Sequence, residues 1–150
     1  MTPLQFIRIP RDRSQPPFKA DQRFRPGWWD RWPAAAASVF FGVEAEGVEV
    51  ARVQIVPAVF PEEYLGVPPF GPDMLKIQLL EVAVDRRREG LGTRVVQALS
   101  HVCQGRRFEA FSEGADEFWM SLGWHRFEHP DGHHQSLFIE PAAEWVSSRS

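Results

Sequence analysis

The sequence has little cysteine and no long apolar run. Its 150 residues contain one cysteine, which cannot form an internal disulfide or a multi-cysteine metal site. We therefore expect a reducing, cytoplasmic compartment. The longest nearly apolar stretch, Ala34 to Val43, has ten residues, about half of the roughly 20 that a membrane-spanning helix needs. No apolar segment follows the N-terminal charges, so no secretory signal is readable. These absences argue against a disulfide scaffold and a membrane protein.

The composition is that of one globular domain over residues 1–150, with 43% apolar and 25% charged residues. Tyrosine is scarce: Tyr64 stands alone beside six Trp and twelve Phe. Residues 1–38 carry seven cationic and three acidic side chains, a net of +4, and the remainder carries ten against seventeen, a net of −7. The total of −3 does not favour a nucleic-acid partner, because phosphate contacts need a basic face.

The hydrophobic pattern predicts a mixed α/β chain. Five prolines break residues 10–33 into turns, and five more make residues 57–73 a loop. The dipeptides Glu46-Gly47 and Asp131-Gly132 predict hairpin turns, with a bulge as an alternative in the first hairpin. We predict strands at 4–9, 39–43, 48–56, 75–84, 108–111, 124–129 and 134–140, and helices at 90–104 and 115–122.

The segment that joins strand 75–84 to helix 90–104 has the chemistry of a diphosphate cradle. The first N–H groups of a helix lack intrahelical acceptors and lie at its positive end. Gly90 and Gly92 remove side chains there, so an anion can approach the backbone closely. Three consecutive arginines, at positions 86–88, add donors suited to phosphate.

Two better-known glycine motifs are excluded at this position. Val95 occupies the sixth place of a G-x-G-x-x-G pattern, and no Gly-Lys-Ser/Thr follows. The remaining alternative is a helix start eased by glycine next to a solvated arginine run.

Two segments resemble the signatures of the GCN5-related N-acetyltransferase (GNAT) family. Residues 87–92, Arg-Arg-Glu-Gly-Leu-Gly, fit the family's Arg/Gln-x-x-Gly-x-Gly/Ala loop, and residues 80–84, Leu-Glu-Val-Ala-Val, look like its central strand. Residues 115–124, Ala-Asp-Glu-Phe-Trp-Met-Ser-Leu-Gly-Trp, are similar to its second signature, Ala-x-x-Phe-Tyr-x-x-Leu-Gly-Phe. The resemblance covers residues 38–140 and is weak over the Pro- and Trp-rich residues 1–37.

The resemblance implies a GNAT-like α/β fold: a mixed, mostly antiparallel twisted sheet with flanking helices and a splayed central pair of parallel strands. It implies that acetyl-coenzyme A lies between those strands, with its pyrophosphate on the loop amides of residues 87–93 and its pantetheine along the backbone of Val82 and Val84. The implied cofactor-binding set is Val82, Ala83, Val84, Arg87, Arg88, Glu89, Gly90, Leu91, Gly92, Thr93, Ser112 and Trp119.

The implied activity is transfer of acetyl from acetyl-coenzyme A to a primary amine of a small molecule or protein. Such catalysis is mostly proximity, with a backbone N–H near Val82 polarising the thioester carbonyl. A catalytically weak coenzyme A-binding or protein-interaction module is the alternative. Action on a charged tRNA or another nucleic-acid-borne amine has the +4 N-terminal segment as its support.

Glu81 is the candidate general base. An amine must lose a proton before it attacks, and Glu81 interrupts an otherwise apolar strand beside the expected thioester. A charged residue there needs a partner or a cavity, so the alternative is a glutamate paired with an arginine on an open sheet face. Gln78 and Glu113 are weaker candidates.

Two positions depart from the family pattern at the sulfur end of the site. Trp119 stands where the family often has a Tyr that protonates the departing thiolate, and an indole N–H is not an acid at any useful pH. Ser112 stands where many relatives have a cofactor-contacting Asn. Ser112, Ser121 or a water molecule could then hydrogen-bond the sulfur.

Other reactive or aromatic residues receive plainer interpretations. The histidines at 129, 133 and 134 lack zinc-like spacing, so we expect no metal, and Cys103 is expected to pack in the core. The Trp-rich segment 28–32 could cover a sheet edge, line an acceptor pocket or form a homodimer contact. In the loop of residues 57–73, the candidate acceptor contacts are Phe60, Tyr64 and Phe70.

Overall fold

A computed structural model describes residues 2–10, 12, 14–30 and 37–143. Its strands form one seven-stranded mixed sheet in the order β1-β2-β3-β4-β5-β7-β6. The chain divides into two compact units, Met1–Val56 with Gln78–Gln104 (unit 1) and Pro57–Ile77 with Gly105–Ser150 (unit 2). Within the described ranges, no helix is long and apolar enough to cross a membrane. The elements are β1 (Leu4–Arg8), β2 (Val39–Ala45), β3 (Val48–Pro57), β4 (Leu75–Val82), η1 (Val84–Arg86), α1 (Leu91–Val102), β5 (Phe108–Phe111), α2 (Asp116–Ser121), β6 (His125–Phe127) and β7 (Leu137–Ile139).

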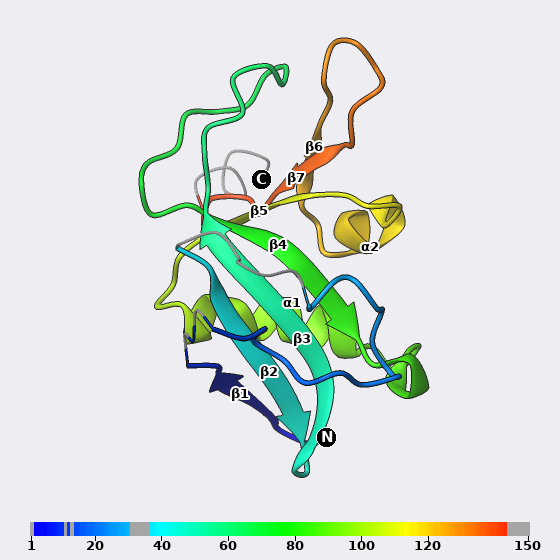
Figure 1. Cartoon of the computed structure of the whole chain (residues 1–150). Coiled ribbons are helices and arrows are strands. Elements are labelled where there is room, and N and C mark those ends of the chain that lie inside the picture. Colours follow the sequence, from blue (N-terminus) through cyan, green and yellow to red (C-terminus); the bar gives the residue numbers. More distant parts are fainter. Residues whose placement is uncertain (1, 11, 13, 31–36, 144–150) are drawn as a thin grey trace. The chain divides into compact units, whose positions relative to one another are not determined.

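Unit 1 is built on the predicted hairpin. Strands β2 and β3 pair antiparallel around the turn at Gly47, whose φ of +79° favours glycine. The register shifts between Val43 and Glu44, which agrees with the bulge that the sequence left as an alternative. Strand β1 pairs with the outer edge of β2. Helix α1 lies behind these strands (Figure 1). Its apolar positions form one buried stripe, Leu91, Val95, Val96 and Leu99.

The segment before β2 is irregular, as its prolines predict, and crosses the front of unit 1 (Figure 1). Phe24 and Trp29 are buried in a cluster with Ala83, which lies just after β4. The described part of the Trp-rich segment therefore packs in the core of unit 1. Residues 31–36, which include the third Trp of that segment, lie outside the described residues.

Unit 2 contains the parallel strand pair. Leu75 and Lys76 of β4 pair in parallel with Phe108 and Glu109 of β5, and these are the first two residues of each strand. Pairing limited to the start of both strands is what a splayed pair requires. Strand β7 pairs antiparallel with both β5 and β6. A cluster centred on Met74, Leu137 and Ile139 fills one face, with residues of the 57–73 loop against it.

The structure corrects the bounds of two predicted segments. Strand β4 ends at Val82 rather than at residue 84, because the carbonyl of Ala83 accepts the N–H of Arg86 and closes a 3-10 turn. The last hairpin has three-residue strands rather than strands of six and seven. Asp131 explains the second difference: its carboxylate accepts the N–H of His133, and such local bonds compete with a strand ladder.

Candidate functional site

The segment predicted to be a diphosphate cradle lies in unit 1, where η1 is followed by α1. Gly90 caps the helix with a φ of +74°, and no side chain caps the first amides of α1. A Cβ built on Gly90 would meet no atom within 4 Å, so the space beside Gly90 is open. The N–H groups of Leu91, Gly92 and Thr93 therefore begin a 12-residue helix with its positive end exposed. This arrangement suits a diphosphate.

The three arginines before the helix are not equivalent. Arg86 forms an ion pair with Glu89 at 3.1 Å. Arg87 donates from Nη2 to Glu81 at 3.2 Å and from Nε to the carbonyl of Val82 at 3.3 Å. Arg88 is exposed and has a φ of +67°. Protein groups therefore hold Arg86 and Arg87, and the expectation that the arginines contact a phosphate stays a prediction.

Glu81 is a buried hub, with 5% of its surface exposed. Both carboxylate oxygens lie 3.0 Å from the backbone N–H of Arg25, which donates to them. The indole N–H of Trp29 donates to Oε1 at 2.8 Å, and Arg87 donates to Oε2. Glu81 is thus paired with an arginine, as in the alternative interpretation, but it is buried rather than on an open sheet face. These donors leave little acceptor capacity for an incoming ammonium.

The same N-terminal segment engages the end of β4. The backbone N–H of Val84 donates to the carbonyl of Arg23 at 2.9 Å, and the carbonyl of Val82 accepts from Arg87. The resemblance assigns the backbone of Val82 and Val84 to the pantetheine. In this structure protein groups occupy one backbone group of each residue, and Val84 belongs to η1 rather than to the strand.

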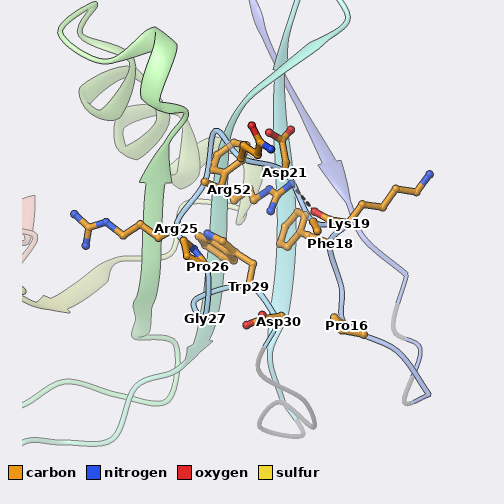
Figure 2. A pocket seen from close by; sticks show the side chains of 13 residues that line it. Pro16, Phe18, Lys19, Asp21, Arg25, Pro26, Gly27, Trp29, Asp30 and Arg52 are labelled. Atoms are coloured by element: carbon orange, nitrogen blue, oxygen red, sulfur yellow. Dashed lines mark hydrogen bonds between the residues drawn. The ribbon is translucent and has the colours of Figure 1, made fainter.

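A cavity of about 720 Å³ opens beside this segment in unit 1 (Figure 2). Its size is in the range of small-molecule sites. The buried Arg52 reaches in from β3 and lies over the rings of Phe18 and Phe24, with its guanidinium carbon 4.7 and 4.0 Å from the ring centroids. Glu49 binds that guanidinium at 3.0 Å. The lining residues are Pro16, Phe18, Lys19, Ala20, Asp21, Gln22, Phe24, Arg25, Pro26, Gly27, Trp29, Asp30 and Arg52.

In unit 2, the side chains of the two predicted cofactor residues, Ser112 and Trp119, contact other protein groups. Ser112 is buried, and its hydroxyl oxygen accepts the N–H of Ala115 at the start of α2. Trp119 is 6% exposed, and its ring lies 4.9 Å from that of Trp124. The Ser121 hydroxyl donates to the carbonyl of Phe118 at 2.6 Å. Of the weaker base candidates, Glu113 of unit 2 and Gln78 of unit 1 are exposed.

The lone tyrosine, Tyr64, lies in the 57–73 loop, and its hydroxyl is hydrogen-bonded to a backbone carbonyl. Tyr64 donates its hydroxyl to the carbonyl of Gln135 at 2.7 Å and packs edge-on against Phe111. Burial, followed by nearby carboxylates, raises the pKa of Tyr64. The other two predicted acceptor contacts, Phe60 and Phe70, pack on each other with ring centroids 5.1 Å apart.

The hairpin histidines form a cluster that their spacing did not predict. One potential ligand atom from each of His129, Asp131 and His134 lies within 4.8 Å of the others. The rings of His129 and His134 stack with their centroids 3.8 Å apart and 16° between their planes. The N–H of His133, followed by the His134 ring, lowers the pKa of Asp131 to about 2.

Glu109 on β5 is the residue that sequence reasoning missed. It is fully buried, and its two carboxylate oxygens are the buried side-chain polar atoms without a hydrogen-bond partner among the described residues. Burial raises the pKa of Glu109 to about 7, and the positive charge of Lys76 opposes that rise. The sequence feature that could have identified Glu109 is its position as a charged residue between Phe108 and Ala110 in a short apolar strand.

Comparisons with known proteins place the fold. No protein-family model matches the chain, and no curated protein matches its sequence. Solved structures do match: the sheet with one parallel pair and two helices is that of GNAT acetyltransferases. The chain has the GNAT fold.

Three matching structures define the extent of the likeness. The N-acetyltransferase YlbP of Bacillus subtilis, solved in complex with coenzyme A, is 18% identical with a TM-score of 0.51 over 68% of this chain and 67% of its own. AtaT complexed with acetyl-methionyl-tRNAfMet is 13% identical with a TM-score of 0.57 over 76% of both chains. The KacTA–DNA complex matches at 12% identity and a TM-score of 0.62 over 99% and 100%.

Two of these three proteins were solved with a nucleic acid. This finding weakens the expectation, drawn from net charge, that this chain is unlikely to have a nucleic-acid partner. Net charge averages over both units, whereas contact with a phosphate backbone depends on a local basic surface.

Proposed function

We propose that the protein is an acyl-coenzyme A-dependent N-acyltransferase that transfers acetyl to a primary amine. The observation that carries the proposal is the open, uncapped start of α1 at Gly90, on the element where the sequence resembles the family's pyrophosphate loop. The GNAT fold supports it, as does a matching structure that holds coenzyme A.

In this proposal, the residues around the cradle bind and orient the cosubstrate. The amides of Leu91, Gly92 and Thr93 donate to the diphosphate, and the helix dipole favours its charge. Glu81 holds Arg87 through a 3.2 Å ion pair, so the guanidinium stays beside the cradle with donors to spare. Glu81 thus has a positioning role. Holding thioester and amine together supplies most of the rate enhancement.

Binding of acetyl-coenzyme A, measured by calorimetry, is the first test. We expect the wild-type chain to bind, and Gly90→Glu to lose at least tenfold in affinity because it places a carboxylate against the diphosphate. Gly47→Glu is the matched control: Gly47 has a φ of +79° and open space around it, so strain and charge are reproduced away from the cradle. Absence of wild-type binding at millimolar cofactor contradicts the proposal.

A coenzyme A-binding or protein-interaction module is the second candidate. Trp119 favours it, because this side chain is buried against Trp124 and offers no acid for the departing thiolate. The cavity beside Arg52 also gives unit 1 a place for a ligand other than coenzyme A. Thioester consumption with a panel of amines separates the two functions, since a module binds coenzyme A without releasing a thiol. The acceptor could also be an amine carried on a nucleic acid, and salt-dependent binding would then be expected.

A further inference from the structure

Glu109 is an anomaly in the core of unit 2. Buried polar groups in folded proteins almost always have a partner, yet neither carboxylate oxygen of Glu109 has one among the described residues. A buried carboxylate without a partner costs free energy. The nearby buried Ser112 and Ser136 show the usual behaviour, since both hydroxyl groups are hydrogen-bonded. A residue kept at such a cost points to a ligand that supplies the missing donors.

The strand register shows which face Glu109 occupies. Glu109 pairs with Lys76 of β4 on one side and with Ile139 of β7 on the other, and residues paired across a sheet share a face. Ile139 belongs to the cluster with Met74 and Leu137. The side chain of Glu109 therefore lies on the face that the 57–73 loop covers.

No described residue donates a hydrogen bond to the Glu109 carboxylate, although Lys76 and His125 lie on the same face by strand register. The loop contributes Tyr64, Val67 and Phe70 to the cluster, and the Tyr64 hydroxyl donates to Gln135 instead. Strand β7 contributes aliphatic side chains. Lys76 is the charged residue whose field acts on Glu109, and its ammonium lies over the ring of Phe111 at 5.4 Å.

Glu109 also marks the end of the parallel pairing. Lys76–Glu109 is the second of two paired positions between β4 and β5, so Glu109 lies where the two strands stop pairing.

We propose that Glu109 is the counter-ion and proton acceptor for the ammonium group of the acyl acceptor, which enters beneath the loop of residues 57–73. This inference rests on the proposed acyltransferase function and names its acceptor as a primary amine that binds in its cationic form. The ammonium is compact and carries three donors, so it matches a carboxylate whose oxygens are both free of donors. A pKa near 7 is suited to a general base at physiological pH.

The chemical step balances without a further reactant. The ammonium gives one proton to the Glu109 carboxylate, which becomes a neutral carboxylic acid. The freed amine attacks the thioester carbonyl, a C–N bond forms, and the C–S bond breaks. The second nitrogen proton leaves with the coenzyme A thiolate, directly or through solvent, and Glu109 later returns its proton to solvent.

The test compares Glu109→Gln with the wild-type chain in three measurements: calorimetry with acetyl-coenzyme A, thiol release with a panel of small primary amines, and the dependence of kcat/KM on pH. We expect equal cofactor affinity and a loss of turnover of at least a hundredfold. We expect the wild-type profile to rise through an ionisation near pH 7, and the residual activity of the variant to lack it. Thermal unfolding should show that the variant is no less stable than wild type at pH 8.

A matched control variant shows whether the expected effect belongs to Glu109 itself or follows from replacing any buried glutamate. Glu140 also lies in unit 2, and burial raises its pKa, but its carboxylate accepts the N–H of Phe108 at 3.2 Å. Glu140→Gln should keep the wild-type pH profile and turnover within a few-fold.

Three other outcomes would each contradict a different part of the proposal. Turnover in Glu109→Gln within a few-fold of wild type, with an unchanged pH profile, overturns the role of Glu109. Wild-type chain that binds acetyl-coenzyme A but releases no thiol with any amine overturns the amine acceptor while the cofactor site stands. Failure of the wild-type chain to bind acetyl-coenzyme A overturns the proposed function itself.

Discussion

Glu81 in unit 1 and Glu109 in unit 2 are both acidic residues buried within short apolar strands, at 5% and 0% exposure. Their surroundings differ completely. Glu81 accepts from the backbone of Arg25, the indole of Trp29 and the guanidinium of Arg87. Glu109 accepts from no described residue. Although their sequence contexts are similar, the Glu81 carboxylate is fully hydrogen-bonded and the Glu109 carboxylate has no hydrogen-bond partner among the described residues.

The presence or absence of hydrogen-bond donors decides whether a buried carboxylate has a structural or a chemical role. A carboxylate bound by several donors fixes the elements that supply them, and Glu81 joins the N-terminal segment, β4 and the cradle. A carboxylate without donors fixes nothing, but it can receive a ligand or a proton. Loss of the Glu81 side chain should therefore lower stability, whereas loss of the Glu109 side chain should raise stability and lower turnover.

The largest expected effect is on stability at Glu81. Glu81→Leu leaves the indole N–H of Trp29 and the amide N–H of Arg25 without an acceptor, and it leaves Arg87 unpaired. Each donor left without an acceptor costs about 1–3 kcal/mol, and together they should lower the melting temperature of a chain of this size by roughly 10 °C. Circular dichroism melts at pH 7 measure this change.

Trp29→Phe is the companion variant for Glu81, because it removes one donor and keeps the carboxylate. We expect it to cost less than Glu81→Leu. An unaltered melting temperature in Glu81→Leu would show that the hub does not hold the N-terminal segment in place.

At Glu109 the stability effect should have the opposite sign and depend on pH. Glu109→Leu removes an unsatisfied carboxylate, which we expect to stabilise the fold by about 1–3 kcal/mol above pH 7. The pKa of Glu109 is raised to about 7 from an ordinary 4.5. The folded state therefore holds a proton that the unfolded state releases between these values, and wild-type stability falls as pH rises through that window.

Urea unfolding at several pH values checks the prediction for Glu109. The gain of Glu109→Leu over wild type should be small near pH 5 and reach its full size above pH 7. A gain that is the same at pH 5 and pH 8 would mean that Glu109 does not change protonation in this range. A loss of stability at both pH values would mean that its oxygens are satisfied after all.

A smaller effect is expected from the cation that faces Glu109. The charge of Lys76 lowers the pKa of Glu109 against the effect of burial, so Lys76→Met should raise that pKa further. In the proposed mechanism, the rising limb of kcat/KM then moves to higher pH, because an opposite charge no longer favours the ionised carboxylate. Lys19→Met, at an exposed cation of unit 1, is the control and should leave the limb in place.

Most of the fold could be predicted from the sequence, because its signals are local. Apolar periodicity and turn dipeptides located each strand and helix to within a few residues, and Gly90 marked the start of α1. Errors occurred where side-chain or backbone bonds replaced the ladder, at Ala83 after β4 and at Asp131 in the last hairpin.

The site was predicted in part, for a physical reason. The cradle depends on neighbours in sequence, so its glycines were visible. The state of Glu81 depends on Trp29, which is 52 positions away, and pattern reasoning could not exclude a catalytic role. The isolation of Glu109 is a property of the whole surrounding core, and no local motif records that a partner is missing.

The smallest expected effect is at the lone tyrosine of the 57–73 loop, which tests whether Glu109 acts without it. Tyr64→Phe removes one hydrogen bond, to the carbonyl of Gln135 at 2.7 Å, and keeps the ring against Phe111. The expected cost is about 1 kcal/mol of unfolding free energy, measured in urea. Since that hydroxyl is already donated to a backbone oxygen, the pH profile of kcat/KM should stay as in wild type. A profile that loses an ionisation in Tyr64→Phe would assign the proton transfer to the tyrosine and remove Glu109 from that role.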